Sequence, residues 1–393
     1  MAPQDRARAL RFIVCLGVVS LFADMTYEGA RSIIGPFLKD LGASAAQVGL
    51  IAGFGEMLAA SLRIFTGRLV DRTRAYWTAT ILGYFVNLIA VPAMAFAGNW
   101  KQAALLVILE RTGKSIRGPA RDVLLSQSTG MVGHGWGFGL HTALDQTGAV
   151  LGPLLIVAAV ARSEHFAPAF LRLALPAAAA LVALVVARAV YPGRDAAPTP
   201  AVAEQPLPRI FWLYVTAAGL LACGYIDFAL LAYHYQSAAL VRPPAIPLLY
   251  ALAMGIDGLA ALSLGKLFDR YGVIVLCAGI LVSMLALPLA FLAGPAGAIA
   301  AVACWAVGMG AQEATLRPGI ARAISMDKRG TAFGAFNAVY GIAWFAGSAA
   351  MGFLYQYSLV ALVVFGVAAQ FAAAAMFFVL RATPSSAASA RRS

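Results

Sequence analysis

The sequence is poor in charged residues. Of its 393 residues, 12% are Asp, Glu, Lys or Arg and 61% are hydrophobic, and the mean hydropathy is +0.81. One soluble core cannot bury so large a share of apolar side chains. The composition therefore excludes an ordinary water-soluble globular protein and indicates a chain that uses the lipid bilayer as its solvent.

Cysteine is also scarce, and the sequence lacks the motifs of several catalytic sites. The four cysteines lie inside apolar runs without metal-ligand spacing: Cys15, Cys223, Cys277 and Cys304. We therefore expect small core residues there, with no metal site and no disulfide. The absence of H-E-x-x-H, of G-x-S-x-G and of a Cys/His cluster argues against a membrane-embedded enzyme, and we expect no cofactor. A sensor without transport activity is disfavoured because the sequence holds no soluble domain to carry an output.

Apolar runs of the length needed to cross a bilayer, about 20 residues, recur along the chain. They predict an all-α membrane protein with twelve transmembrane helices, at about 10–38, 45–66, 76–97, 100–121, 134–160, 166–190, 209–236, 244–267, 273–293, 296–324, 329–355 and 358–381. Residues 191–209 contain five prolines among small and polar residues, which excludes a spanning helix there. We therefore predict a six-helix bundle at 1–190, a linker at 191–209 and a second six-helix bundle at 210–393, which ends in a short basic tail.

Basic residues exceed acidic ones, and the formal net charge is +12. They do not form a soluble patch suited to nucleic acid; they gather at the termini and in alternate loops. By the positive-inside rule both termini are predicted to be cytoplasmic. The first apolar run is long, is interrupted by charges and lacks a small-residue cleavage site, so we expect a first span and not a signal peptide.

Two sequence repeats relate the halves. Gly67-Arg-Leu-Val-Asp71-Arg72 and Gly265-Lys-Leu-Phe-Asp269-Arg270 each follow one apolar run and precede another, so each predicts an Asp and an Arg at a helix end or in a short loop. Phe138-Gly139 and Gly152 match Phe333-Gly334 and Gly347 at a constant offset. Parallel six-helix repeats are typical of transporters that work by alternating access.

On these residues the chain resembles twelve-helix members of the major facilitator superfamily over nearly its whole length. The first repeat is similar to the gating motif G-x-L-x-D-R-x-G-R-R of that superfamily, but Thr73-Arg74-Ala75 replaces the usual x-Gly-Arg. The second copy keeps its glycine at Gly272. Gly139, Gly148 and Gly152-Pro153 match the core of the antiporter motif of proton-coupled drug exporters, without its trailing Gly-Gly. Glycines four residues apart allow close helix packing, and Pro153 is expected to kink its helix.

The resemblance implies a secondary active transporter of the bacterial inner (cytoplasmic) membrane. We assign gating roles to the residues of these motifs and to two charged neighbours: Gly67, Asp71, Arg72, Arg121, Asp145, Gly148, Gly152, Pro153, Gly265, Asp269 and Arg270. The expected partners are a small-molecule substrate, protons and the lipid bilayer, with no nucleic acid, and we expect a monomer.

Ionisable residues inside the predicted spans are functional candidates because charges are costly in the bilayer. Their spacing forms one stripe on each of four helices: Asp24, Glu28 and Arg31; Glu110, Lys114, Arg117 and Arg121; Asp227 and His234; Glu313 and Arg317. In the superfamily these helices, the first, fourth, seventh and tenth, line a central cavity, so the resemblance implies that the stripes converge. Five acids against five bases predict a polar or charged substrate.

Within these stripes we assign proton coupling to the four acids Asp24, Glu28, Asp227 and Glu313, with Asp24 and Glu28 as the leading carriers. Substrate binding is assigned to Arg31, Glu110, Lys114, Arg117, His234 and Arg317. Alternatives stay open: Asp227 and Glu313 as counterions of Arg317 or as helix caps, and Lys114, Arg117 and Arg121 as permanent salt-bridge partners. Two transport functions fit, namely proton-coupled export of a small polar or charged organic molecule, and proton- or exchange-driven uptake of an organic anion.

Overall fold

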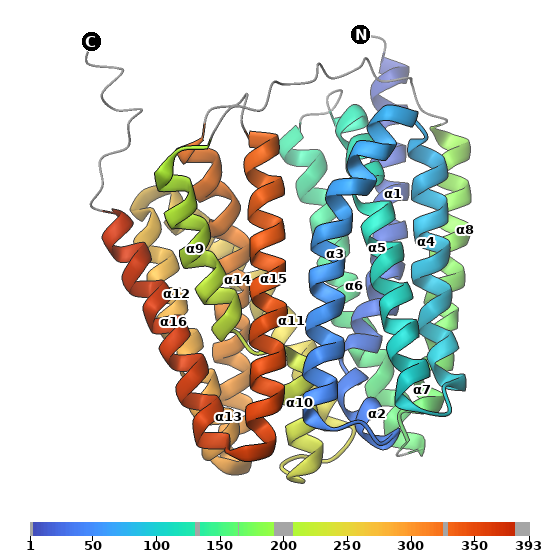
Figure 1. Ribbon diagram of the computed structural model, residues 1–393. Helices are drawn as coiled ribbons and strands as arrows, with labels where there is room; N and C mark the ends of the chain where they lie inside the picture. Colours follow the sequence, from blue (N-terminus) through green and yellow to red (C-terminus); the bar gives the residue numbers. More distant parts are fainter. Residues whose placement is uncertain (1–2, 130–133, 164, 192–206, 325–328, 382–393) are drawn as a thin grey trace, which may run out of the picture. The chain divides into compact units, whose positions relative to one another are not determined.

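The computed structural model describes residues 3–129, 134–163, 165–191, 207–324 and 329–381 (Figure 1). Most of the predicted linker and the basic C-terminal tail lie outside these residues. The described residues form α-helices and one 3-10 helix, and no strand occurs among them. In chain order the elements are α1 (Pro3–Arg31), α2 (Ile34–Asp40), α3 (Ala45–Thr73), α4 (Tyr76–Ala93), η1 (Met94–Phe96), α5 (Trp100–Thr129), α6 (His134–Ser163), α7 (Ala167–Arg172), α8 (Ala174–Val190), α9 (Arg209–Gly224), α10 (Phe228–Ser237), α11 (Ala245–Tyr271), α12 (Val273–Met284), α13 (Ala286–Leu292), α14 (Gly294–Ala323), α15 (Arg329–Tyr357) and α16 (Leu359–Arg381).

Each predicted span coincides with one of these helices or with two consecutive ones. Among the described residues, 11 helical stretches are long and apolar enough to cross a membrane. The remaining predicted span is α5, which has 30 residues but carries a dense group of charges. The predicted all-α membrane fold is confirmed. The sequence predicted twelve spans, and α5 is absent from the 11 apolar stretches because of its charges.

Several spans contain a break that the apolar pattern does not reveal. The most central break separates α9 from α10, inside the stretch Arg209–Ser237. Tyr225, Ile226 and Asp227 leave the helical path there, and the Asp227 carboxylate accepts a hydrogen bond of 2.9 Å from the backbone N–H of Ala229. Asp227 therefore acts as the N-cap of α10, one of the two alternatives to proton coupling raised by the sequence.

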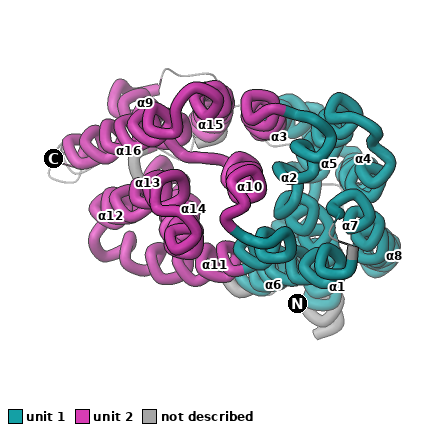
Figure 2. Tube along the Cα trace, turned by 90° about the horizontal axis from the view of Figure 1, so that it is seen from below, with its two compact units in different colours: residues 1–43, 58–199, 241–251 teal, residues 44–57, 200–240, 252–393 magenta. Residues whose placement is uncertain are grey.

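The chain divides into two compact units (Figure 2). Unit 1 comprises Met1–Ala43, Leu58–Thr199 and Val241–Ala251, and unit 2 comprises Ser44–Met57, Pro200–Leu240 and Leu252–Ser393. Helices α3 and α11 each contribute one part to each unit. The uninterrupted bundles 1–190 and 210–393 stay a prediction.

Glycines permit the same close helix contact within each unit. A Cβ atom at Gly152 of α6 would overlap the carbonyl oxygen of Met25 in α1, and one at Gly347 of α15 would overlap the carbonyl oxygen of Cys223 in α9. Gly148, one turn before Gly152, has the same relation to α1. The repeated glycines found in the sequence thus occupy equivalent packing positions in the two units. Pro153 lies inside α6, which continues through it.

We predict that Gly152→Ala destabilises the protein, because α1 and α6 must move apart to admit a methyl group. Overpacking of this kind costs about 1–3 kcal/mol, and a lower melting temperature of the purified protein would report it. Gly139→Ala in the same helix is the matched control, since nothing lies within 4 Å of a Cβ atom there. Equal melting temperatures for the two variants would contradict the packing argument.

Candidate functional site

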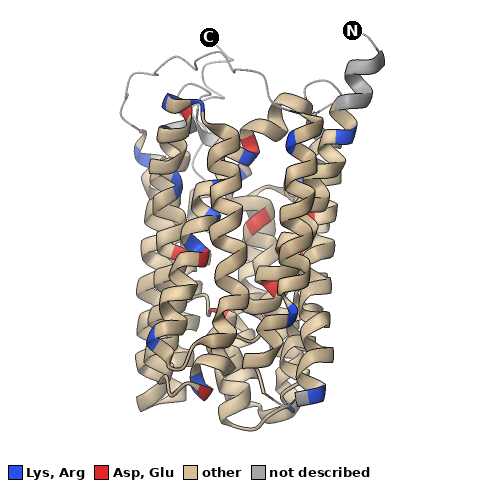
Figure 3. Ribbon diagram, turned by 90° about the vertical axis from the view of Figure 1, so that its right-hand side faces the viewer, with Lys and Arg blue, Asp and Glu red and all other residues tan. Residues whose placement is uncertain are grey.

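Charged residues are sparse along the helices (Figure 3), and those of α1, α5 and α6 meet inside unit 1. Together with the tyrosines between them, they form a group that we call the polar cluster: Asp24, Tyr27, Glu28, Arg31, Tyr84, Glu110, Lys114, Arg117, Arg121, His141 and Asp145. The cluster brings together the predicted stripes of the first and fourth spans. Among the described residues, no group of three or more His, Cys, Asp or Glu side chains is arranged to hold a metal ion.

Close packing of α4 on α5 builds one side of the cluster. Cβ atoms at Gly83 and Gly113 would overlap backbone atoms of the facing helix, namely those of Arg117 and Asn87. This close approach sets the ring of Tyr84, the residue after Gly83, 4.4 Å from the guanidinium carbon of Arg117. Gly83 and Gly113 therefore help to position Arg117.

Arg117 lies between two tyrosine rings. It is 2% exposed, and its guanidinium carbon is 5.4 Å from the ring centre of Tyr27. The Lys114 ammonium lies 4.0 Å from the centre of the same ring. Such cation–π contacts contribute about 0.5–2 kcal/mol each. Because the Nε atom of Arg117 has no hydrogen-bond partner among the described residues, it is a buried donor that an acceptor group can use.

Asp24 of α1 is the most deeply buried acid of the cluster, at 3% exposure. Its carboxyl group interacts with the Asp145 carboxyl on α6, and Tyr27 and Arg117 are further neighbours. The Oδ1 atom of Asp24 has no hydrogen-bond partner among the described residues, and the same holds for Oδ1 of Asp145. The structure thus places an assigned proton carrier against a residue to which the sequence assigned a gating role.

Arg121 and His141 lie beside this acid pair. The Nη2 atom of Arg121 is 2.9 Å from Oδ1 of Asp122, and its Nη1 donates to Ser20 Oγ over 3.4 Å. Ser20 Oγ is also 3.3 Å from Nε2 of His141. Arg121 therefore connects α5 to α1 while an adjacent acid balances its charge.

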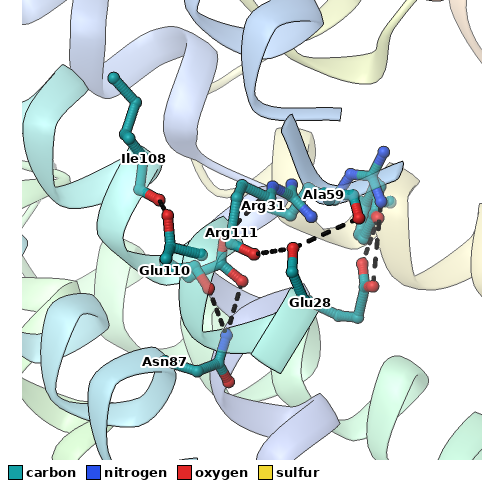
Figure 4. A network of polar contacts seen from close by, with 10 residues as sticks. Glu28, Arg31, Ala59, Asn87, Ile108, Glu110 and Arg111 are labelled. Atoms are coloured by element: carbon teal, nitrogen blue, oxygen red, sulfur yellow. Dashed lines mark hydrogen bonds and ion pairs between the residues drawn. The ribbon is translucent and has the colours of Figure 1, made fainter. Parts of the chain in front are cut away.

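Glu28, by contrast, has contacts at both carboxylate oxygens. Its Oε1 is 4.0 Å from Nη1 of Arg31 (Figure 4), and its Oε2 accepts a hydrogen bond from the Tyr250 hydroxyl. Tyr250 belongs to the first turns of α11, which are part of unit 1. This tyrosine was not anticipated from the sequence, because no local spacing relates residues so far apart in the chain.

Glu110 joins α4 to α5. Asn87 Nδ2 donates to Oε1 of Glu110 over 2.8 Å and to its backbone oxygen over 3.0 Å. Oε2 of Glu110 is 3.1 Å from Nε of Arg111 (Figure 4). The Glu110 carboxylate is thus occupied by neighbours in its own unit, and its assigned role in substrate binding stays a prediction.

Unit 2 surrounds the break between α9 and α10 mainly with neutral polar groups. Trp305 Nε1 donates to the Ile226 carbonyl over 2.8 Å, and Gln370 Nε2 donates to the Gly224 carbonyl over 2.9 Å. The Tyr225 hydroxyl donates to the carbonyl oxygen of Trp305. A discontinuous helix with its backbone groups satisfied in this way is a common feature of substrate-binding regions in transporters.

The other assigned residues of unit 2 are spread over different elements. His234 of α10 packs on the ring of Phe291 at 4.6 Å between ring centres, and its Nδ1 is 3.0 Å from the Tyr355 hydroxyl. Glu313 and Arg317 are exposed on α14, where both lie near Tyr340. The structure therefore places His234 in an aromatic cluster and leaves its substrate-binding role a prediction.

The two G-x-L-x-D-R repeats lie in the last turns of α3 and α11, which confirms the predicted helix ends. The residue at the turn that follows has a positive φ in both copies, 54° at Arg74 and 63° at Gly272. Glycine adopts this conformation readily, whereas other residues rarely do. Arg74 thus keeps the backbone conformation of the motif without its glycine.

Removing the Asn87 amide tests how much its hydrogen bonds to Glu110 contribute to the stability of the fold. We expect Asn87→Ala to lower the free energy of unfolding by about 1–3 kcal/mol, because a buried carboxylate oxygen loses its donor. Thermal unfolding in detergent measures the change. Thr78→Ala, at an exposed position of the same helix, is the control, and equal losses in the two variants would show that the Asn87–Glu110 contact contributes nothing.

Comparisons with known proteins give a consistent picture. A family model described as Major Facilitator Superfamily matches residues 16–348. An uncharacterized protein of Mycobacterium tuberculosis (strain ATCC 25618 / H37Rv) is 39% identical over 393 residues, which covers 97% of this chain and 95% of that protein. An uncharacterized MFS-type transporter of Methanocaldococcus jannaschii is 30% identical over 143 residues, or 36% of each chain.

Solved structures show the same fold at low sequence identity. The nucleoside transporter NupG matches with a TM-score of 0.75 and 11% identity, covering 95% of this chain and 100% of that one. An auto-inhibited peptide transporter of the POT family matches with a TM-score of 0.73 and 13% identity, covering 95% and 97%. Similarity at this level concerns the fold alone, so the substrates of those proteins are not transferred.

Proposed function

Because the chain belongs to the major facilitator superfamily and is a membrane transporter, we propose that it couples proton movement to the export of a small polar or charged organic molecule. The proposed mechanism is alternating access by a monomer. The proposed location is a bacterial inner membrane with both termini on the cytoplasmic side, as the distribution of basic residues indicates.

The observation that supports proton coupling is the environment of Asp24. A carboxyl group buried in the bilayer without a complete set of donors can take up and release a proton, and Oδ1 of Asp24 is such a group. Glu28 instead contacts Arg31 and Tyr250. Asp227 caps a helix, and Glu313 lies exposed on α14. Asp24 is therefore the leading proton carrier of the proposal.

The substrate class follows from the basic members of the polar cluster. Arg117 offers a buried Nε–H donor, with the Lys114 ammonium beside the Tyr27 ring that both residues share. An uncharged lipophile would leave such groups poorly solvated. A polar substrate with a hydrogen-bond acceptor, such as a zwitterion or an organic acid, suits them better.

The same basic groups support a second candidate function, the uptake of an organic anion. Carboxylate and phosphate groups form strong charge-assisted hydrogen bonds with guanidinium donors. The two functions differ in the direction of proton flow. In proton-loaded vesicles, external substrate alkalinises the lumen during exchange against protons and acidifies it during uptake together with protons.

A stability screen of the purified protein tests the substrate class. Amino acids, organic acids and charged drugs are expected to raise the melting temperature, because a ligand at 100 times its Kd stabilises the native state by about 2.7 kcal/mol. Arg31→Ala, Arg117→Ala and Arg317→Ala should each weaken this effect, while Lys101→Ala, at the exposed start of α5, should preserve it. Stabilisation confined to neutral lipophiles, unchanged in the arginine variants, would refute the polar-substrate proposal.

Coupling is tested with Asp24→Asn in vesicles, using a substrate from that screen. The amide resembles the protonated acid but cannot titrate, so gradient-driven transport should be abolished while substrate binding and counterflow exchange continue. Glu28→Gln serves as the comparison within the same helix. If both variants retained normal gradient-driven transport, the first helix would not carry the coupling proton.

A further inference from the structure

We propose that Asp24 and Asp145 form one proton-binding site in which a single proton is shared between two carboxyl groups on α1 and α6. This inference rests on the proposed proton coupling and deepens it, because it adds a second residue to the proton carrier. It also changes the role of Asp145, which the sequence assigned to gating.

The first argument is the contact itself. The two carboxyl groups interact on helices whose backbones are in close contact at Gly148 and Gly152, and an ionised carboxylate is only an acceptor. Two carboxylates in contact would therefore repel each other and share no hydrogen. One proton changes this, because the protonated group becomes an O–H donor to the other, as in the paired acids of aspartic proteases.

The second argument is the shortage of donors around the pair. Oδ1 of Asp24 and Oδ1 of Asp145 both lack a hydrogen-bond partner among the described residues. Buried acceptors without donors are costly. A proton held between the carboxyl groups supplies a donor from within the pair, without any movement of the helices.

The charged and titratable neighbours come from four helices. On α1 they are Tyr27 and Glu28, on α4 Tyr84, on α5 Lys114, Arg117 and Arg121, and on α6 His141. Glu28 has Arg31 and Tyr250 as partners, and Arg121 is paired with Asp122. Among the described residues, Arg117 forms no salt bridge with a carboxylate. It is thus the cation that acts on both Asp24 and Asp145.

The position of the pair connects the proton to helix packing. Asp24 lies between Leu21 and Met25, the two α1 residues whose backbone contacts Gly148 and Gly152 of α6. Release of the proton leaves two carboxylates across this tightly packed contact, whereas uptake restores a hydrogen bond between the helices. Proton occupancy therefore changes the interaction of α1 with α6 directly.

Infrared difference spectroscopy of the full-length protein in lipid tests the proposal, with protons as the only ligand. The carbonyl stretch of a protonated carboxyl is separate from the carboxylate bands. At neutral pH, the spectrum of the wild type minus that of Asp24→Asn should show the band of one protonated carboxyl per chain. The difference for Asp145→Asn should show the same band, because removal of the second carboxylate leaves Arg117 to favour the ionised form of Asp24.

Asp40→Asn, at the exposed end of α2, is the control and should leave the band unchanged. Matching helical content and melting behaviour in all variants guard against misfolding, and the Asp24→Asn/Asp145→Asn double variant should lose no more than the one band. A band that disappears in Asp24→Asn but persists in Asp145→Asn would overturn the shared site, as would its absence from the wild type.

These results are separable from the proposed function. If transport proved to be proton-driven while the band did not depend on Asp145, the shared site would fail and the coupling proposal would stand. If the band depended on both acids while transport was independent of the proton gradient, the shared site would stand and the coupling proposal would fail.

Discussion

The low dielectric constant of the bilayer constrains this molecule more than any other factor, since every charge placed in it must find its partners inside the protein. The chain meets this requirement with contacts between helices. Glu110 is held by Asn87 and Arg111, and Arg117 lies between two tyrosine rings. Such contacts need helices that approach closely, which explains why glycines and charges occur together in α1, α5 and α6.

Length, hydropathy and repeats were sufficient to predict the fold. Each apolar run produced a helix or a pair of helices because a bilayer leaves the backbone few other ways to satisfy its hydrogen bonds. The matched glycines also predicted close packing correctly, as Gly152 and Gly347 show. The break at Tyr225–Asp227 was not predicted because the apolar run continues on both sides of it, and an Asp also occurs inside an unbroken helix, as Asp24 does in α1. Asp227 is nevertheless a residue type that favours helix N-caps.

The candidate site was predicted less completely. Helical spacing placed Asp24, Glu28 and Arg31 on one face, but it carries no information on which residue of another helix each one meets. That depends on the register between α1 and α6 and between α4 and α5, which close packing determines. Tyr27 lies on the same helical face as Asp24 and Glu28, so helical spacing alone identifies it as a candidate. No local pattern in the sequence relates Tyr84, Asn87 or Tyr250 to the polar cluster.

The contacts around the break between α9 and α10 are made largely by groups that hold no exchangeable charge. Three of the contacts around it involve only the neutral side chains of Trp305, Gln370 and Tyr225, whose hydrogen bonds do not change when protons are gained or lost near neutral pH. The Asp227 carboxylate holds the start of α10 through the backbone N–H of Ala229. The hydrogen bonds of these three side chains therefore persist whether or not a proton is bound elsewhere in the protein. If Asp24 and Asp145 share a proton as proposed, the acid pair of unit 1 responds to protonation, whereas these contacts of unit 2 do not.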